Sequence, residues 1–183
     1  MSNLHIRALV ALLLLFLMVA ALMFVPPWTL DYWQAWTFLA VYFGASVAIT
    51  LYLMKRDPQL LARRMSGRPA AEKRPAQRII MLLASLGFIG LLVIPALDRR
   101  FAWSHMSPGV ALAGDVLVGL GFLGVFFVFR ENSFTSATIE LAPDQKVIST
   151  GPYALVRHPM YAAALVMLLG IPIALGSWWG WRY

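Results

Sequence analysis

The chain has 183 residues, of which 61% are hydrophobic and 13% are charged, and its net charge is +7. This composition is too apolar for a water-soluble globular domain of that length, so we expect an integral membrane protein. The absence of cysteine excludes disulfide bonds and cysteine-based zinc sites.

Five apolar stretches approach the length of a transmembrane helix, which is about 20 mostly apolar residues. These candidate spans are residues 8–25, 36–53, 79–97, 112–129 and 161–175, and only the last is short. Arg7 precedes the first span as in a signal peptide, but Pro26 and Pro27 follow it in place of a cleavage site, so we interpret it as a retained helix. The predicted fold class is all-α: a polytopic helical membrane protein with about five transmembrane helices in one domain, residues 1–183.

Most of the positive charge lies between the second and third predicted helices. Eight of the fifteen Lys and Arg residues are there: Lys55, Arg56, Arg63, Arg64, Arg68, Lys73, Arg74 and Arg78. Basic loops face the cytoplasm, so we predict a cytoplasmic N-terminus and cytoplasmic residues 130–160, with Asp31 and His105 facing outward. Attraction to anionic lipid headgroups explains this loop better than nucleic-acid binding. We therefore expect membrane lipids, and no nucleic acid, as partners.

The fourth predicted helix differs from the others in its small residues. Its glycines let neighbouring helices approach closely; they are Gly114, Gly119, Gly121 and Gly124. Asp115 is the only acid inside an apolar span. Because it lies near the outer end of the helix, we expect its side chain to reach interfacial water.

The chain becomes polar between the fourth and fifth predicted helices, and residues 130–161 are expected to form a cytoplasmic segment of the single domain. The polar side chains that follow Arg130 are Glu131, Asn132, Ser133, Thr135, Ser136, Glu140, Asp144, Gln145 and Lys146. Pro143 and Asp144 predict a turn, in a short hairpin or an extended piece.

Residues 151–161 read G-P-Y-A-L-V-R-H-P-M-Y and form what we term the signature segment. Hydroxyl side chains just before it can cap a helix, and Pro152 suits a first helical turn, so a short helix should begin there. Pro159 disfavours helical geometry at His158 and is itself well placed to begin the fifth transmembrane helix. The sequence therefore predicts a break at Arg157 and His158.

Two helix beginnings so close together should present unpaired backbone amides to one small volume, which favours an anion such as a carboxylate. Arg157 could pair with that carboxylate in bidentate fashion, while His158, Tyr153 and Tyr161 offer hydrogen bonds. The alternative is a turn at the membrane interface, with Arg157 on lipid phosphates, His158 at a helix cap and both tyrosines in the aromatic belt.

The pattern G-P-Y-x-x-x-R-H-P-x-Y resembles the signature of the isoprenylcysteine carboxyl methyltransferase and phospholipid methyltransferase family. The resemblance is strongest over residues 130–179, where Glu131, Asn132 and the three residues that follow also resemble a polar turn of the bacterial members. It implies transfer of a methyl group from S-adenosylmethionine to a lipid-like or amphiphilic acceptor at the cytoplasmic face of the bacterial inner membrane. It also implies a cofactor pocket that faces the cytoplasm and an acceptor that enters from the bilayer.

The resemblance assigns roles to residues of the signature segment that match the family motif. Arg157 and His158 are the expected catalytic residues, and the expected cofactor contacts are Tyr153, Arg157, His158, Pro159 and Tyr161, with no metal ion. A carboxylate acceptor needs no general base, whereas an amine or hydroxyl must lose a proton, for which His158 is the best-placed base. The sequence is compatible with both kinds of acceptor, and it leaves the oligomeric state open.

The chain departs from the family pattern in two places. Ala162 and Ala163 stand where a glycine is common, and the family continues past the position of Tyr183 into a returning helix and a segment with paired glutamates, so this C-terminal catalytic segment is expected to be absent. Sterol reductases of the membrane type carry a similar R-H-P-x-Y motif and bind NADPH, which makes a reductase the alternative enzyme. A non-enzymatic membrane scaffold is the third hypothesis.

Overall fold

The computed structural model describes residues 3–66, 75–132 and 149–181, and every regular element within these ranges is a helix. The longer helices are α1 (Asn3–Phe24), α2 (Trp33–Arg56), α4 (Pro75–Phe101), α5 (Pro108–Glu131) and α7 (Pro159–Ala174). The shorter ones are α3 (Pro58–Ser66), α6 (Pro152–Leu155) and the 3₁₀ helix η2 (Trp179–Trp181).

Four of these helices, α1, α2, α4 and α5, are long and apolar enough to cross a membrane. The fifth predicted span coincides with α7, which has 16 residues and so rises about 24 Å, less than the roughly 30 Å of a bilayer's hydrocarbon core. These helices confirm the predicted fold class, a polytopic helical membrane protein.

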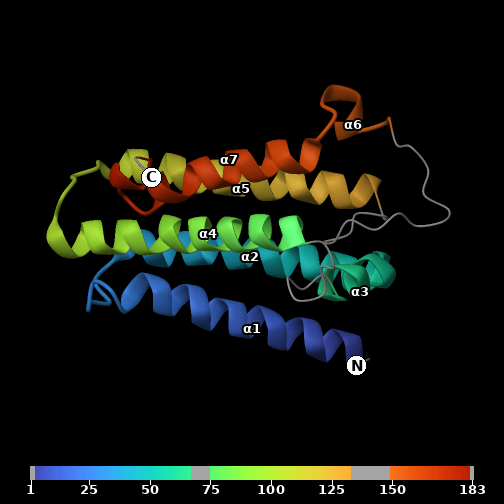
Figure 1. The fold of residues 1–183 in the computed structure, drawn as a ribbon, viewed down its shortest axis with the longest axis horizontal. Coiled ribbons are helices and arrows are strands. Elements are labelled where there is room, and N and C mark those ends of the chain that lie inside the picture. Colours follow the sequence, from blue (N-terminus) through green and yellow to red (C-terminus); the bar gives the residue numbers. More distant parts are fainter. Residues whose placement is uncertain (1–2, 67–74, 133–148, 182–183) are drawn as a thin grey trace.

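The longer helices run largely side by side, and their connections gather at two ends of the molecule (Figure 1). The N-terminus, α3 and α6 lie at one end, which we term the signature end. The α1–α2 and α4–α5 connections and the last residues of α7 lie at the other, which we term the opposite end. The start of the basic loop and the signature segment thus share one end, as the sequence predicts; the assignment of that end to the cytoplasm stays a prediction.

Helices α5 and α7 form the closest pair in the molecule because glycines face the contact. A Cβ built on Gly114 would lie 2.2 Å from the backbone nitrogen of Ala174, and one on Gly121 would lie 2.6 Å from the Cβ of Met167. Either distance is too short for a side chain, so the predicted small-residue contact is confirmed at these glycines. Gly119 instead faces Val41 of α2 at 3.9 Å.

The tight packing changes the environment of Asp115. Its side chain is buried, with 6% exposure, and its two carboxylate oxygens accept no hydrogen bond from the described residues. The nearby Thr37 hydroxyl donates to the backbone carbonyl of Gln34 at 3.0 Å. The prediction that Asp115 reaches interfacial water is wrong, because α7 and α2 pack over the first turns of α5.

Helix α3 was not predicted, although it lies within the basic loop. Asp57 caps its first turn by accepting a hydrogen bond from the Leu60 amide at 2.9 Å. Leu60 and Leu61 are buried against the ends of α2 and α5, and the Arg64 guanidinium lies 4.9 Å from the centre of the Phe129 ring. This burial lowers the pKa of Arg64. Helix α3, in the described first part of the basic loop, therefore packs against the signature end of α5.

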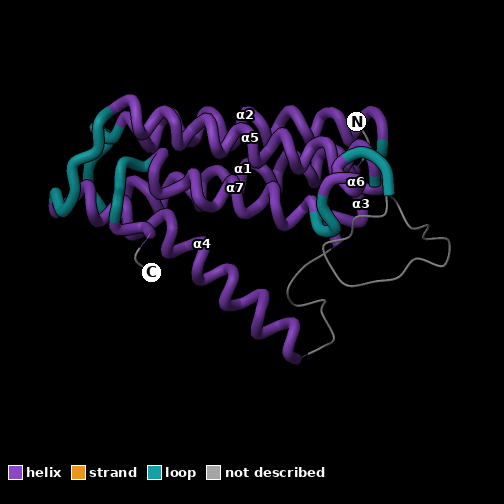
Figure 2. Tube along the Cα trace, turned by 90° about the horizontal axis from the view of Figure 1, so that it is seen from above, coloured by secondary structure: helices purple, strands orange, loops and turns teal. Residues whose placement is uncertain are grey.

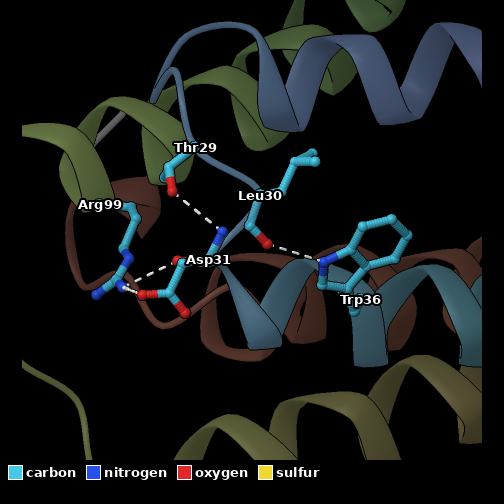
Figure 3. Close-up of polar contacts among 5 residues, drawn as sticks. All are labelled: Thr29, Leu30, Asp31, Trp36 and Arg99. Carbon is cyan, nitrogen blue, oxygen red and sulfur yellow. Dashed lines mark hydrogen bonds and ion pairs between the residues drawn. The ribbon is translucent and has the colours of Figure 1, made fainter.

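Helix α4 runs beside the bundle at the opposite end and diverges from it toward its first residues (Figure 2). The diverging half exposes large aliphatic side chains: Ile79, Ile80, Leu82, Leu83 and Leu86. Its last turn is held in place, since Arg99 donates to the backbone carbonyl of Asp31 at 3.0 Å and lies 3.6 Å from its carboxylate (Figure 3). The loop between α1 and α2 is also bound to α2, because the Trp36 indole donates to the carbonyl of Leu30.

Candidate functional site

The backbone of the signature segment matches the prediction closely. Helix α6 starts at Pro152 and ends before Val156, which is extended with φ −140° and ψ 143°. His158 is the N-cap of α7 with φ −129° and ψ 67°, and Pro159 is its first residue. The break at Arg157 and His158 is therefore confirmed, and its cause is the ring of Pro159, which excludes helical geometry from the residue before it.

The entry to α6 is occupied by a carboxylate from the protein itself. The Thr150 hydroxyl donates a short hydrogen bond to the side chain of Glu131, the last residue of α5. Gly151 has φ +57°, a conformation that favours glycine, and a Cβ there would lie 3.0 Å from the Glu131 carboxylate. This position thus needs a glycine both for its backbone and for the space that Glu131 fills.

The amides of α6 are also used internally. Those of Tyr153, Ala154 and Val156 donate to the carbonyls of Thr150, Gly151 and Pro152 at 3.1–3.2 Å. The prediction that both helix starts present unpaired amides to one anion is therefore wrong for α6. Only the start of α7 remains as a site where backbone amides lack intrahelical acceptors.

Tyr153 contacts Asn132, the residue that follows α5, although the two are 21 positions apart in the sequence. The Asn132 side-chain amide donates to the Tyr153 hydroxyl oxygen at 2.8 Å. Among the described residues, none accepts the hydrogen of this hydroxyl. The turn predicted at Pro143 and Asp144 lies outside the described residues.

The remaining polar groups of the signature segment face outward. Arg157 and His158 are exposed, and the Tyr161 side chain is 74% exposed. The His158 and Tyr161 rings lie with centroids 5.8 Å apart. Pro159, by contrast, is buried at the start of α7. The structure thus brings His158 and Tyr161 together, and it gives Arg157 no hydrogen bond or ion pair with the described residues.

An open apolar groove of about 630 Å³ runs beside these groups between α5, α6 and α7. Its lining comprises Leu120, Gly124, Phe127, Pro152, Leu155, Val156, Pro159, Ala162, Ala163 and Val166. Ala162 is exposed on this side, whereas the Cβ of Ala163 would lie 2.8 Å from one built on Gly124 of α5. Both alanines thus line the groove, and Ala163 also forms the contact with α5.

The sequence did not assign a role to Glu131 or Asn132. Both belong to the stretch that resembles bacterial family members, and that was the one available signal. Their partners Thr150 and Tyr153 are separated from them by about 20 residues, and sequence separation alone does not indicate a contact. In the described part of the chain, no three His, Asp or Glu side chains gather as a metal ion would require.

Comparison with known families identifies the part of the chain that contains this site. Residues 110–182 match the family model described as phospholipid methyltransferase, in agreement with the resemblance that the signature segment indicates. The matched residues include nearly all of α5, then α6, α7 and η2. No curated protein and no solved structure matches the chain.

Proposed function

We propose that this membrane protein transfers a methyl group from S-adenosylmethionine to a lipid-like or amphiphilic acceptor at the cytoplasmic face of the membrane. The match of residues 110–182 to the phospholipid methyltransferase family supports this proposal. The observation that carries the proposal is the position of the signature segment inside the matched region, with its polar groups exposed beside an apolar groove. Such an arrangement suits a reaction between a polar cofactor and an acceptor with an apolar body.

The signature segment has groups that fit the polar parts of this cofactor. Arg157 is exposed and makes no ion pair with the described residues, so its planar guanidinium can bind a carboxylate in bidentate fashion. The start of α7 adds backbone amides next to it. The Tyr153 and Tyr161 hydroxyls can form hydrogen bonds with the amino-acid or ribose part of the cofactor. Buried Pro159 fixes the position at which α7 begins beside them.

The chemistry needs alignment more than proton transfer. When bound, the cofactor supplies an electrophilic methyl group, whose bond to sulfur breaks as the bond to the acceptor oxygen or nitrogen forms. The protein must hold donor and acceptor in line and exclude water. An amine acceptor also loses a proton, and the exposed imidazole of His158 can accept it.

The apolar groove is better suited to the acceptor than to the cofactor. Leu155 is 87% exposed at the mouth of the groove, a position that costs free energy in water but not against lipid chains. Carboxylate and amine headgroups would both approach the exposed edge at Arg157 and His158. We therefore infer entry of the acceptor from the bilayer along α5 and α7.

The orientation of the site can be tested by labelling, since the chain lacks cysteine. Single cysteines at Gln59 in α3 and at Ala154 in α6 should react with an impermeant reagent from the cytoplasmic side. Cysteines at Asp31 and His105 should react from the outside. Labelling of positions 59 and 154 from opposite sides would show that the proposed topology is wrong.

The function itself is tested by calorimetric titration of the purified protein in lipid nanodiscs with S-adenosylmethionine, its demethylated product S-adenosylhomocysteine, and NADPH. We expect the first two to bind at micromolar to millimolar strength, on the order of typical enzyme substrates. Arg157→Ala should weaken binding, whereas Arg56→Ala, which removes an exposed cation from the same end, should not. Binding of NADPH alone would favour the reductase, and binding of none of the three would favour the scaffold.

A further inference from the structure

Two adjacent residues at the end of α5 contact the signature segment, and the family signature does not include either of them. Glu131 accepts a hydrogen bond from Thr150 and contacts Gly151. Asn132 donates to the hydroxyl of Tyr153 at 2.8 Å. We term these two contacts the α5 bridge.

The bridge matters because α6 has little else to fix its position. None of the four residues of α6 is buried, and Leu155 is 87% exposed. A helix of one turn has no stability of its own. Its position relative to α5 must therefore come from the bridge and from its connection to α7 through Val156, Arg157 and His158.

The two contacts of the α5 bridge hold different groups, one the backbone before α6 and the other the Tyr153 side chain. The Glu131 carboxylate holds the backbone where the chain enters α6, through the Thr150 hydroxyl and against Gly151. The Asn132 amide holds the phenol of Tyr153 and, by using its oxygen as an acceptor, directs the phenol hydrogen away from α5. Helix α5 is itself held by α7, because Gly114, Gly121 and Gly124 are packed directly on it.

We propose that Glu131 and Asn132 are positioning residues of the methyl-transfer site, which hold the Thr150–Tyr153 turn so that the Tyr153 hydroxyl meets the cofactor in a fixed geometry. This inference rests on the proposed function. Neither residue touches the reacting atoms; both act through Thr150 and Tyr153. Removing the bridge should thus weaken cofactor binding while the helices of the membrane domain stay folded.

A double-mutant cycle tests the Asn132 contact in the full chain. Asn132→Ala and Tyr153→Phe should each weaken S-adenosylhomocysteine binding by about three- to tenfold, as expected for one neutral hydrogen bond. The double variant should bind no more weakly than the worse single one, because both changes remove the same interaction. Asn132→Asp should hold the phenol ring without restoring binding, since its carboxylate would accept the hydrogen of the Tyr153 hydroxyl that the proposal leaves to the cofactor.

The Glu131 contact is tested in the same assay with Thr150→Val, which removes the hydroxyl at nearly constant volume, and Thr150→Ser, which keeps it. We expect a loss of affinity for the first and near-normal affinity for the second, with turnover at saturating cofactor changed less than the cofactor's KM. Thr50→Val is the matched control, because the Thr50 hydroxyl bonds only within α2, to the carbonyl of Ser46. Gln59→Ala controls for the loss of an exposed side-chain amide at the same end.

A second readout does not depend on any ligand. Fluorotyrosine placed at position 153 should give one sharp ¹⁹F resonance that shifts or broadens in Asn132→Ala and returns toward its original position in Asn132→Asp. An unchanged resonance in Asn132→Ala, or additive losses in the double-mutant cycle, would overturn the positioning role. The resonance could also respond while the protein binds neither S-adenosylmethionine nor S-adenosylhomocysteine. That result would refute the proposed function, and the α5 bridge would then not serve cofactor binding.

Discussion

The buried cluster around Asp98 at the opposite end and the exposed side chains of the signature segment use their polar groups in opposite ways. At the opposite end Asp98 is buried, with 2% exposure, and accepts hydrogen bonds from the Ser104 amide at 2.8 Å, from the Ser104 hydroxyl and from the Ser177 hydroxyl at 2.5 Å. At the signature end Arg157 and His158 are exposed and without hydrogen bonds to the described residues. Polar groups that satisfy one another stabilise the fold, whereas polar groups left open beside a groove are available to a ligand.

The largest expected effect is on stability, at the opposite end. Asp98→Ala removes the acceptor of three hydrogen bonds and leaves buried hydroxyls unpaired, which should lower the free energy of unfolding by about 3 kcal/mol. Cofactor affinity at low temperature should be unchanged. Thermal unfolding in detergent measures the change in stability, and calorimetry measures the cofactor affinity.

Asp31→Ala is the control for this prediction. Asp31 lies at the same end, but its side chain is 93% exposed and its contact with the Arg99 side chain is 3.6 Å long, so its removal should not change stability measurably. Equal losses in Asp98→Ala and Asp31→Ala would contradict the distinction between a buried network and an exposed pair.

The second prediction concerns turnover at the signature end. His158→Ala should lower methyl transfer to an amine acceptor by about a hundredfold, the lower range for loss of a general base, with a smaller change in cofactor affinity. His105→Ala, at the exposed surface of the opposite end, should not affect either quantity. A loss that appears only in cofactor affinity would make His158 a binding residue instead of a base.

The third prediction concerns the geometry of one cation. Arg157→Lys keeps the charge but loses the planar fork, so cofactor affinity should fall about tenfold while expression and thermal stability persist. The same change at Arg99, which pairs with Asp31 at the opposite end, should leave affinity intact. Normal methyl transfer and cofactor binding in both Arg157→Ala and His158→Ala would show that these side chains are interfacial anchors.

Much of the fold follows from local rules that the sequence displays. Apolar length predicts the spans, and the prolines at 152 and 159 predict α6, the break and the start of α7. Helix α3 escaped prediction because its nine residues are rich in polar groups, and its stability comes from burial of Leu60 and Leu61 against distant helices.

The errors at the candidate site have the same physical origin. Asp115 was expected in water because its place in the sequence is near a helix end, but its exposure depends on how closely α7 and α2 pack on α5. The anion at the start of α6 was expected from a ligand, whereas Glu131 of α5 occupies that position. Contacts between residues far apart in the chain decided both cases, and the motif carried no information about either.

The smallest expected effects come from removing one tyrosine hydroxyl at each end of the molecule. Tyr161→Phe removes the hydroxyl of a residue that is 74% exposed at the signature end, and Tyr32→Phe removes a buried hydroxyl that donates to the carbonyl of Leu175 at 2.7 Å. Each should cost about 0.5–1.5 kcal/mol, the value of one neutral hydrogen bond. In Tyr161→Phe the loss should appear in cofactor affinity, measured by calorimetry, with no change in thermal stability. In Tyr32→Phe it should appear in thermal stability with no change in affinity. If Tyr161→Phe lowered stability instead, its hydroxyl would belong to the fold, and the contrast between an open end and a satisfied end would fail at this residue.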